Sequence, residues 1–94
     1  MRTRKISCFV IVCNEEDRIE RCLQSLSGWV DQLIVLDSGS KDNTVAIAQQ
    51  YADKVYQTDW PGFGPQRNRA LTWCEHDWVL NIDADEVMTD ALKA

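Results

Sequence analysis

Four short strand-like runs are spaced along the chain, and each of the first three is followed by a segment with helical spacing. The runs are residues 6–13, 32–36, 54–57 and 78–82. The second run has no polar residue between Leu33 and Leu36, which is typical of a strand buried on both faces of a parallel sheet. We therefore expect an α/β fold with three layers and a mostly parallel sheet, with strands in the spatial order 3-2-1-4.

The segments between these runs have the apolar spacing of helices. The first helix is expected at about residues 15–27, and Gly28 is expected to end it. Its apolar residues recur at i, i+3, i+4 and i+7: Ile19, Cys22, Leu23 and Leu26. Asp42 is the expected N-cap of the second helix, whose stripe is Val45, Ala48 and Ala52.

The third helix is expected to start at Pro65, because proline suits the first helical position. It is expected to bury Ala70, Leu71 and Cys74. Residues 78–82 then form a fourth strand that is expected to be buried.

Acidic and small polar residues follow three of the expected strands. These residues are Asn14-Glu15-Glu16, Asp37-Ser38-Gly39-Ser40 and Asp83-Ala84-Asp85. In a parallel sheet the carboxyl ends of the strands lie at one edge, where ligands bind. Glu15, Asp37 and Asp83 are therefore expected to converge there, and paired carboxylates suit a divalent cation that is shared with substrate phosphates. The alternative for Asp83 and Asp85 is a solvated acidic turn.

Composition excludes several classes of protein. The 94 residues make one domain, 1–94, and the formal charge of −5 argues against nucleic acid as the main partner. No stretch approaches the roughly 18 apolar residues of a membrane span, and no signal peptide is visible. The four cysteines form no Cys-x-x-Cys pair, which favours a reduced cytosolic chain over a disulfide scaffold.

Four motifs together resemble the family 2 glycosyltransferases with the GT-A fold, a Rossmann-like sandwich. They are residues 12–16, 37–44, 67–70 and 83–86, and the resemblance covers about residues 6–94. The sequence Leu36-Asp37-Ser38-Gly39-Ser40, combined with residues 59–66, looks closest to bacterial transferases of lipopolysaccharide core assembly. The family's common proline and aromatic residue are absent at Val12-Cys13, and the chain looks truncated after the fourth strand.

The resemblance implies roles for residues at the nucleotide. Val12, Asn14 and Glu15 would line the nucleotide pocket, and Asp37 would accept a hydrogen bond from the nucleobase or ribose. An ionised Asp is only an acceptor, and uracil offers an imide N–H. The alternative for Asp37 is an Asx residue that starts a turn.

The resemblance also implies roles at the diphosphate. Asp85 would bind a divalent metal, Mn²⁺ or Mg²⁺, and Asp83 would bind the ribose, or the metal through water. Arg67 would reach the diphosphate or help to position Asp83, and its alternative is a solvated charge on a helix.

Four aromatic residues divide into two groups. Trp60 and Phe63 lie in a Gly/Pro loop and are the better candidates for a contact with the substrate. Trp73 and Trp78 are expected to pack in the core or at a strand edge.

The function implied by the resemblance is inverting, metal-assisted transfer from a nucleotide-sugar donor, a UDP-sugar, to a glycan or lipid-linked acceptor such as the lipopolysaccharide core. The catalytic base is expected beyond Ala94, so this chain alone is expected to be inactive. A cytoplasmic location, extending to the cytoplasmic face of the inner membrane, is implied. Peripheral association with that membrane is a further expectation. A homo-oligomer is also expected, because a sheet cut after its fourth strand leaves an edge uncovered.

Two other classes remain open at this stage. Asp83-Ala84-Asp85-Glu86-Val87 also fits the signature of Mg²⁺-dependent phosphatases of the haloacid-dehalogenase type, but in that fold the motif follows the first strand. A non-catalytic nucleotide-binding module is the other alternative, and a test for bound nucleotide sugar would separate the three.

Overall fold

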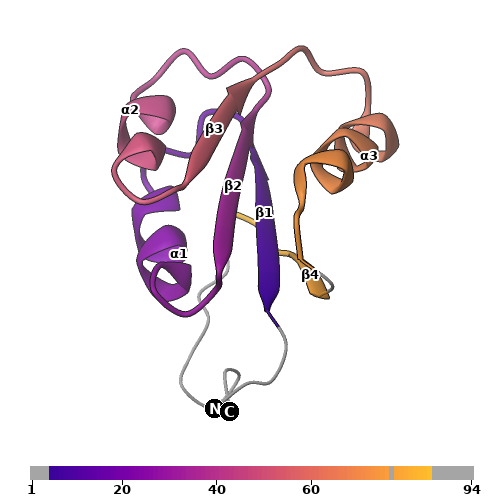
Figure 1. The fold of residues 1–94 in the computed structure, drawn as a ribbon. Helices are drawn as coiled ribbons and strands as arrows, with labels where there is room; N and C mark the ends of the chain where they lie inside the picture. Colours follow the sequence, from indigo (N-terminus) through magenta and orange to yellow (C-terminus); the bar gives the residue numbers. More distant parts are fainter. Residues whose placement is uncertain (1–4, 77, 86–94) are drawn as a thin grey trace.

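The computed structural model describes residues 5–76 and 78–85, which alternate strictly between strands and helices (Figure 1). The elements are β1 (Ile6–Val12), α1 (Ile19–Leu26), β2 (Gln32–Asp37), α2 (Thr44–Gln49), β3 (Lys54–Gln57), α3 (Phe63–Trp73) and β4 (Trp78–Asn81). All strand pairs in this part of the chain are parallel, and the order is β3-β2-β1-β4. The predicted fold class and strand order are confirmed.

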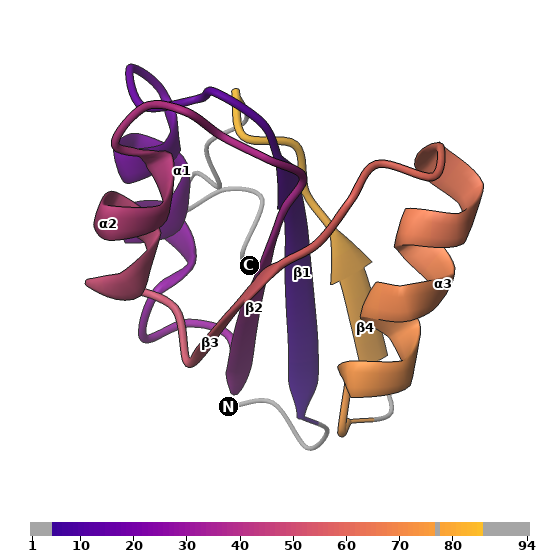
Figure 2. The same cartoon turned by 90° about the horizontal axis from the view of Figure 1, so that it is seen from above.

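Helices cover both faces of the sheet (Figure 2). We call the side under α1 and α2 the α1/α2 face, and the opposite side the α3 face. Alternate residues of β1 point to the two sides, since Cys8 and Val10 pack with α1 whereas Phe9 packs with Ala70 of α3. The predicted three layers are therefore present, and β1 lies at their centre.

The α1/α2 face is apolar and closely packed. Its fully buried residues from α1 are the four predicted from the helical stripe: Ile19, Cys22, Leu23 and Leu26. They pack against Leu33 and Val35 of β2 and against Ala48 of α2. Gly28, at φ +83°, follows α1 as predicted, because the left-handed conformation that ends a helix suits glycine.

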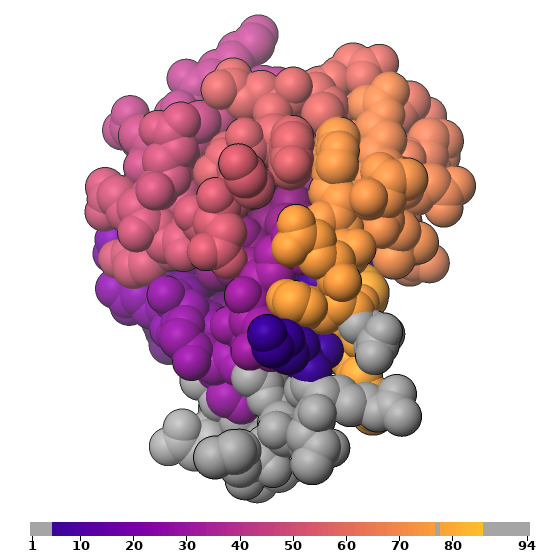
Figure 3. Space-filling model, viewed as in Figure 1, coloured from indigo at the N-terminus to yellow at the C-terminus, as the bar shows by residue number. Residues whose placement is uncertain are grey.

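The α3 face has a smaller apolar cluster and depends on polar contacts at its amino-terminal edge. Gln32 Nε2 donates to the carbonyl of Trp73 (3.2 Å), and Gln32 Oε1 accepts from Ser7 Oγ (2.7 Å) and from the Glu75 N–H (2.9 Å). The Trp73 ring stacks on Tyr56 with centroids 3.8 Å apart. These contacts hold the end of α3 on the sheet. In Figure 3 the orange atoms of α3 and of the segment after it cover most of β1, of which only a small indigo patch is visible.

Three helical boundaries differ from the prediction. α1 begins at Ile19 rather than near Glu15, and residues 16–18 form a separate turn in which the Arg18 and Ile19 N–H groups bond to the Glu15 carbonyl (3.0 and 2.9 Å). α2 has Asn43, not Asp42, at its N-cap position, although Asp42 does accept a hydrogen bond from the Thr44 N–H (3.0 Å). Pro65 is the third residue of α3 rather than the first, which the unpaired N–H groups of a first turn allow.

Two predictions of burial are wrong. Leu71 is 44% exposed and Cys74 is half-buried, because the buried stripe of α3 runs through Gln66 and Ala70. β4 is mostly exposed rather than buried, with Trp78 at 55%. The reason is that β4 is the last strand of the described sheet and has a neighbouring strand, β1, on one side only. Its apolar run belongs to an edge strand in this structure.

Candidate functional site

The parallel topology brings three strand ends to one edge of the sheet. Val12, the last residue of β1, pairs with Asp37, the last residue of β2. Beyond β4, the Ile82 N–H donates to the Phe9 carbonyl (3.2 Å), so the chain still runs beside β1 as it approaches Asp83. Glu15, Asp37 and Asp83 therefore follow neighbouring strands at the same edge, as predicted from the sequence.

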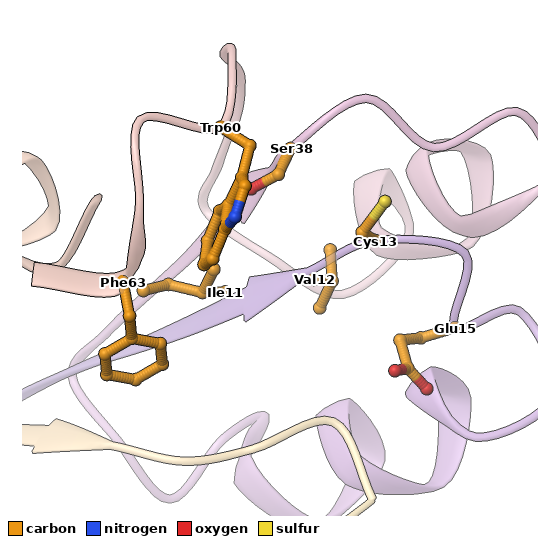
Figure 4. Close-up of a pocket in the computed structure, with 7 residues that line it drawn as sticks. All are labelled: Ile11, Val12, Cys13, Glu15, Ser38, Trp60 and Phe63. Carbon is orange, nitrogen blue, oxygen red and sulfur yellow. The ribbon is translucent and has the colours of Figure 1, made fainter. Parts of the chain in front are cut away.

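A pocket of about 380 Å³ opens at this edge (Figure 4). The residues that line it come from the end of β1, the β1–α1 loop, the residue after β2, the β3–α3 loop and the start of α3: Ile11, Val12, Cys13, Glu15, Ser38, Trp60 and Phe63. Figure 4 shows Trp60, Ser38, Ile11 and Phe63 gathered at one end and Glu15 at the other. The pocket thus has an aromatic end and an acidic end.

The pocket lies where the chain crosses the sheet. β3 is the last strand on one side of β1, and the connection through Trp60 and Phe63 leads to α3 and then to β4 on the other side. Open α/β sheets bind ligands at the carboxyl ends of strands, where the direction of strand order reverses. The position of the pocket is therefore the one that this topology favours for a ligand.

Two loops at this edge are joined by reciprocal hydrogen bonds. The Asn14 N–H donates to Ser40 Oγ (2.7 Å), while Asn14 Oδ1 accepts from the Lys41 N–H (2.8 Å). The Glu15 N–H donates to Thr44 Oγ1 (2.8 Å). Asn14 has φ +54°, a conformation that Asn tolerates better than most residues. These bonds fix the chain that carries Glu15 at the acidic end of the pocket.

The two carboxylate oxygens of Asp37 have different surroundings. Its Oδ2 accepts from the N–H groups of Gly39 (3.1 Å) and Ser40 (2.9 Å), which is the predicted Asx turn. Its Oδ1 is buried and has no hydrogen-bond partner among the described residues. A buried acceptor without a donor costs free energy, so a ligand N–H or O–H placed there would be stabilised.

The aromatic end is built from two rings and a cation. Trp60 and Phe63 meet edge to face, with centroids 6.5 Å apart, and Trp60 is 53% exposed. The Arg67 guanidinium lies 5.3 Å from the centre of the Phe63 ring and is exposed. Trp60 and Phe63, the two aromatic residues expected to contact a ligand, thus both line the pocket.

The two carboxylates of the acidic motif are exposed on either side of Ala84, which is buried in the α1/α2 core. Cys22 Sγ donates to the Asp83 carbonyl (3.5 Å), which ties this loop to α1. Within residues 5–76 and 78–85 no group of three or more His, Cys, Asp or Glu side chains is arranged to hold a metal. Exposed carboxylates nevertheless suit a hard cation that takes its remaining oxygens from a diphosphate and water.

The predicted residues are distributed unevenly around the pocket. Val12 and Glu15 line it, whereas Asn14 and Asp37 are next to lining residues in the sequence and Arg67 lies over the ring of Phe63. Ile11, Cys13 and Ser38 line the pocket although the sequence analysis gave them no role, and Gln66, which bonds to Ser38, was also missed. The i, i+4 relation of Gln66 to the buried Ala70 is the signal that would have found it.

The cysteines differ in their surroundings. Cys13 is exposed at the pocket, whereas Cys8 and Cys22 are buried in the core, and all four are free thiols. Burial, and after it the neighbouring Cys22 and Cys74, raises the pKa of the Cys8 thiol to about 12. Burial also raises the pKa of Cys74. Cys13 is therefore the most accessible thiol for a reagent at this edge.

No described helix is long and apolar enough to cross a membrane.

Comparison with known proteins identifies the family. The model of the family described as Glycosyl transferase family 2 matches residues 7–93. An uncharacterized glycosyltransferase of Rickettsia bellii (strain RML369-C) is 46% identical over 91 residues, which cover 97% of this chain and 31% of that protein. The lipopolysaccharide core biosynthesis glycosyltransferase LpsC of Rhizobium meliloti (strain 1021) is 37% identical, covering 94% of this chain and 34% of LpsC.

Solved structures agree. Glucosyl-3-phosphoglycerate synthase from Mycobacterium tuberculosis superposes with a TM-score of 0.79 at 35% identity, covering 90% of this chain and 35% of that one. The same enzyme in complex with Mn²⁺, UDP-glucose and phosphoglyceric acid gives a TM-score of 0.77, covering 87% of this chain and 33% of that one. The chain thus spans about a third of the length of its relatives. The predicted GT-A fold is confirmed, and the chain belongs to glycosyl transferase family 2.

Proposed function

We propose that the protein containing this chain transfers a sugar from a UDP-linked donor, and that the pocket binds the uridine diphosphate part of the donor. The observation that carries the proposal is the position of the pocket, at the carboxyl ends of β1 and β2 where the chain crosses the sheet. The M. tuberculosis synthase, which has the same fold, is known in complex with UDP and with Mn²⁺ and UDP-glucose.

The uracil base is assigned to the aromatic end. Trp60 and Phe63 offer ring surfaces on which a base can stack, and Oδ1 of the nearby Asp37 has no hydrogen-bond partner within residues 5–76 and 78–85. The imide N–H of uracil would supply the missing hydrogen bond. Val12 forms the floor between the base and Glu15, while Asn14 shapes the loop through its bonds to Ser40 and Lys41.

The diphosphate is assigned to the acidic motif, whose residues lie at the same edge of the sheet as the pocket but do not line it. Asp85, with Asp83, would hold a divalent cation, Mn²⁺ or Mg²⁺, which neutralises the charge that develops on the departing diphosphate. Arg67 sits on Phe63 with its guanidinium exposed, which leaves its N–H groups available to phosphate oxygens. Asp83 holds the loop against α1 through its carbonyl and presents its carboxylate to the ribose or the cation.

The acceptor half of the reaction is inferred from relatives. By similarity to LpsC, we assign the acceptor to lipopolysaccharide core assembly, and by family we assign an inverting mechanism whose base lies beyond Ala94. We assign the reaction to the cytoplasmic face of a membrane, because the proposed donor is soluble and the proposed acceptor is lipid-linked.

Protection of Cys13 tests the donor site directly. The full-length protein would be treated with a thiol reagent with and without UDP and Mn²⁺, and the modified cysteines would be identified by mass spectrometry. We expect UDP to slow modification of Cys13, which lines the pocket, and to leave the half-buried Cys74 unchanged. Unchanged modification of Cys13 at UDP concentrations that saturate binding would place the nucleotide elsewhere.

The metal assignment needs a substitution. Asp85→Asn is expected to lower turnover of the full-length enzyme by about 10²–10³, because electrostatic stabilisation of the leaving group is lost. Asp17→Asn is the control, since Asp17 is also exposed in a loop but follows β1. The assay is transfer from a UDP-sugar at matched thermal stability. If Asp85→Asn keeps near wild-type turnover, the acidic motif is a solvated turn.

A further inference from the structure

One buried side chain connects the aromatic end of the pocket to the rest of the fold. Gln66 lies in the first turns of α3 and is 0% exposed. Its Nε2 is within hydrogen-bond distance of Ser38 Oγ (2.9 Å), Thr58 Oγ1 and the Asp59 carbonyl (3.2 Å). Ser38 lines the pocket, and Thr58 and Asp59 directly precede Trp60.

The orientation of this amide is determined by its neighbours. Arg69 Nη1 donates to Gln66 Oε1 (3.2 Å), and a guanidinium is only a donor. The Asp59 carbonyl on the other side is only an acceptor, so it requires the N–H₂ group of Gln66. Arg69 also pairs with the Asp59 carboxylate (2.6 Å), which joins α3 to the same loop a second time.

Polar contacts anchor the loop that carries Trp60: besides the amide of Gln66, they are the Arg69–Asp59 ion pair and a hydrogen bond from the Thr58 N–H to the Asp37 carbonyl (2.8 Å). The Trp60 side chain is 53% exposed and Phe63 is 46% exposed, so core packing does not fix either ring. Gly62 adopts φ +112°, where the chain turns from the loop into α3. The position of the aromatic end therefore depends on polar contacts more than on apolar burial, and Gln66 is the buried side chain among these contacts that also reaches Ser38.

We infer that Gln66 is a positioning residue for the nucleobase: its amide holds Trp60 and Ser38 side by side at the aromatic end of the pocket. The inference rests on the proposed function, because it takes the base of UDP as the occupant of that end. It assigns Gln66 no contact with the ligand. The amide acts through Thr58, Asp59 and Ser38, and loss of its donors frees the loop to move away from the base.

A second buried glutamine provides a matched control. Gln32 bonds to the carbonyl at the other end of α3 and lies at the opposite edge of the sheet from the pocket. Gln66→Met and Gln32→Met each keep the length of the side chain and remove its amide. Both are expected to lower the melting temperature, but only Gln66→Met is expected to change the aromatic end.

The experiment measures binding of two ligands to the full-length protein by calorimetry, at a temperature where every variant is folded. UDP carries the base, and pyrophosphate with Mn²⁺ does not. We expect Gln66→Met to weaken UDP about tenfold, within the range for loss of base stacking, and to leave pyrophosphate unchanged. Gln32→Met is expected to leave both affinities unchanged. In the Trp60→Ala background the effect of Gln66→Met on UDP should largely disappear, since interacting residues are not additive.

Thr58→Val serves if Gln66→Met does not fold, because it removes one acceptor of the same amide. Acrylamide quenching of Trp60, obtained by subtracting a Trp60→Phe variant, reports the position of the ring without a ligand and should rise in Gln66→Met but not in Gln32→Met. Normal UDP affinity in Gln66→Met, or equal losses for UDP and pyrophosphate, would overturn the inference and leave the proposed function standing. Failure of the wild-type protein to bind UDP would overturn both, whereas unchanged quenching alone refutes the link from Gln66 to Trp60.

Discussion

The two faces of the sheet are held by different kinds of interaction. Under α1 and α2 the contacts are apolar, and the four residues of the α1 stripe are fully buried. On the α3 face the helix buries Gln66 and Ala70, and two glutamines hold its ends through hydrogen bonds. Apolar packing is insensitive to direction, whereas hydrogen bonds are strong only in a narrow geometry.

The two faces also contribute to the pocket in different ways. The α1/α2 face forms the support, and its loops fix Glu15 through Thr44. The α3 face supplies Trp60 and Phe63, which are exposed and project from a loop. The pocket therefore has a stable apolar support on one side and, on the other, an aromatic wall that polar contacts hold in place. Such an arrangement suits a ligand that enters and leaves.

The largest expected effect lies in the α1/α2 core. Leu23→Ala should lower the free energy of unfolding by about 2–5 kcal/mol, because it leaves a cavity beneath a fully buried position. Leu71→Ala on α3, where the side chain is 44% exposed, should change it by roughly 0.5 kcal/mol or less. Urea unfolding of the two variants measures the contrast, and equal losses would show that the faces do not differ as described.

The next effect concerns the junction between the two loops. Thr44→Val keeps the shape of a buried side chain but removes the hydroxyl that bonds to Glu15 and Asp42, so it should cost about 1–3 kcal/mol. Thr72→Val is the control, since that exposed hydroxyl bonds only within α3 in the described structure. The measurement is again urea unfolding, and a neutral Thr44→Val would mean that the loops are held by other contacts.

A smaller effect is expected where β3 meets α3. Tyr56→Leu should lose about 0.5–1.5 kcal/mol beyond the change in buried area, because the stack on Trp73 is removed. Hydrogen exchange should become faster in α3 and stay unchanged in α1. Exchange that rises equally in both helices would show that the two layers open as one unit.

The smallest effects concern the carboxyl groups of two residues, Asp42 just before α2 and Asp59 just before α3. The hydrogen bond from the Thr44 side chain is the main cause that lowers the pKa of Asp42, whereas the hydrogen bond and the charge of Arg69 lower the pKa of Asp59. A lowered pKa in the folded state means that each carboxylate stabilises the protein above its ordinary pKa, and that this contribution is lost as the pH falls through the lowered value. The loss therefore begins near pH 4.

Salt separates the two carboxyls. Titration of the carboxyl carbons by NMR in 1 M salt should move the pKa of Asp59 up towards its ordinary value, since screening weakens an exposed ion pair. The pKa of Asp42, which depends on hydrogen bonds, should move less. Equal shifts for both would contradict the causes given for them.

The sequence was sufficient for the features that depend on local pattern. Periodicity identified α1 and its buried residues, and the alternation of elements gave the strand order, because right-handed crossovers leave few topologies. The acidic residues after β1, β2 and β4 were placed at one edge for the same reason. Val12 and Glu15, which the resemblance assigned to the nucleotide site, line the pocket at this edge, and the family comparison confirmed the resemblance itself.

Tertiary structure alone decided the parts that depend on contacts between distant residues. Nothing in the order of residues indicates that Gln66 reaches Ser38 or that Asn14 reaches Ser40, and the apolar run of β4 did not indicate that this strand is mostly exposed. A buried amide has no hydropathy signal, because its burial is possible only when its partners come from other segments. The sequence by itself therefore determined the sheet and the edge at which a ligand would bind, while the folded chain determined which side chains shape the pocket and what holds them there.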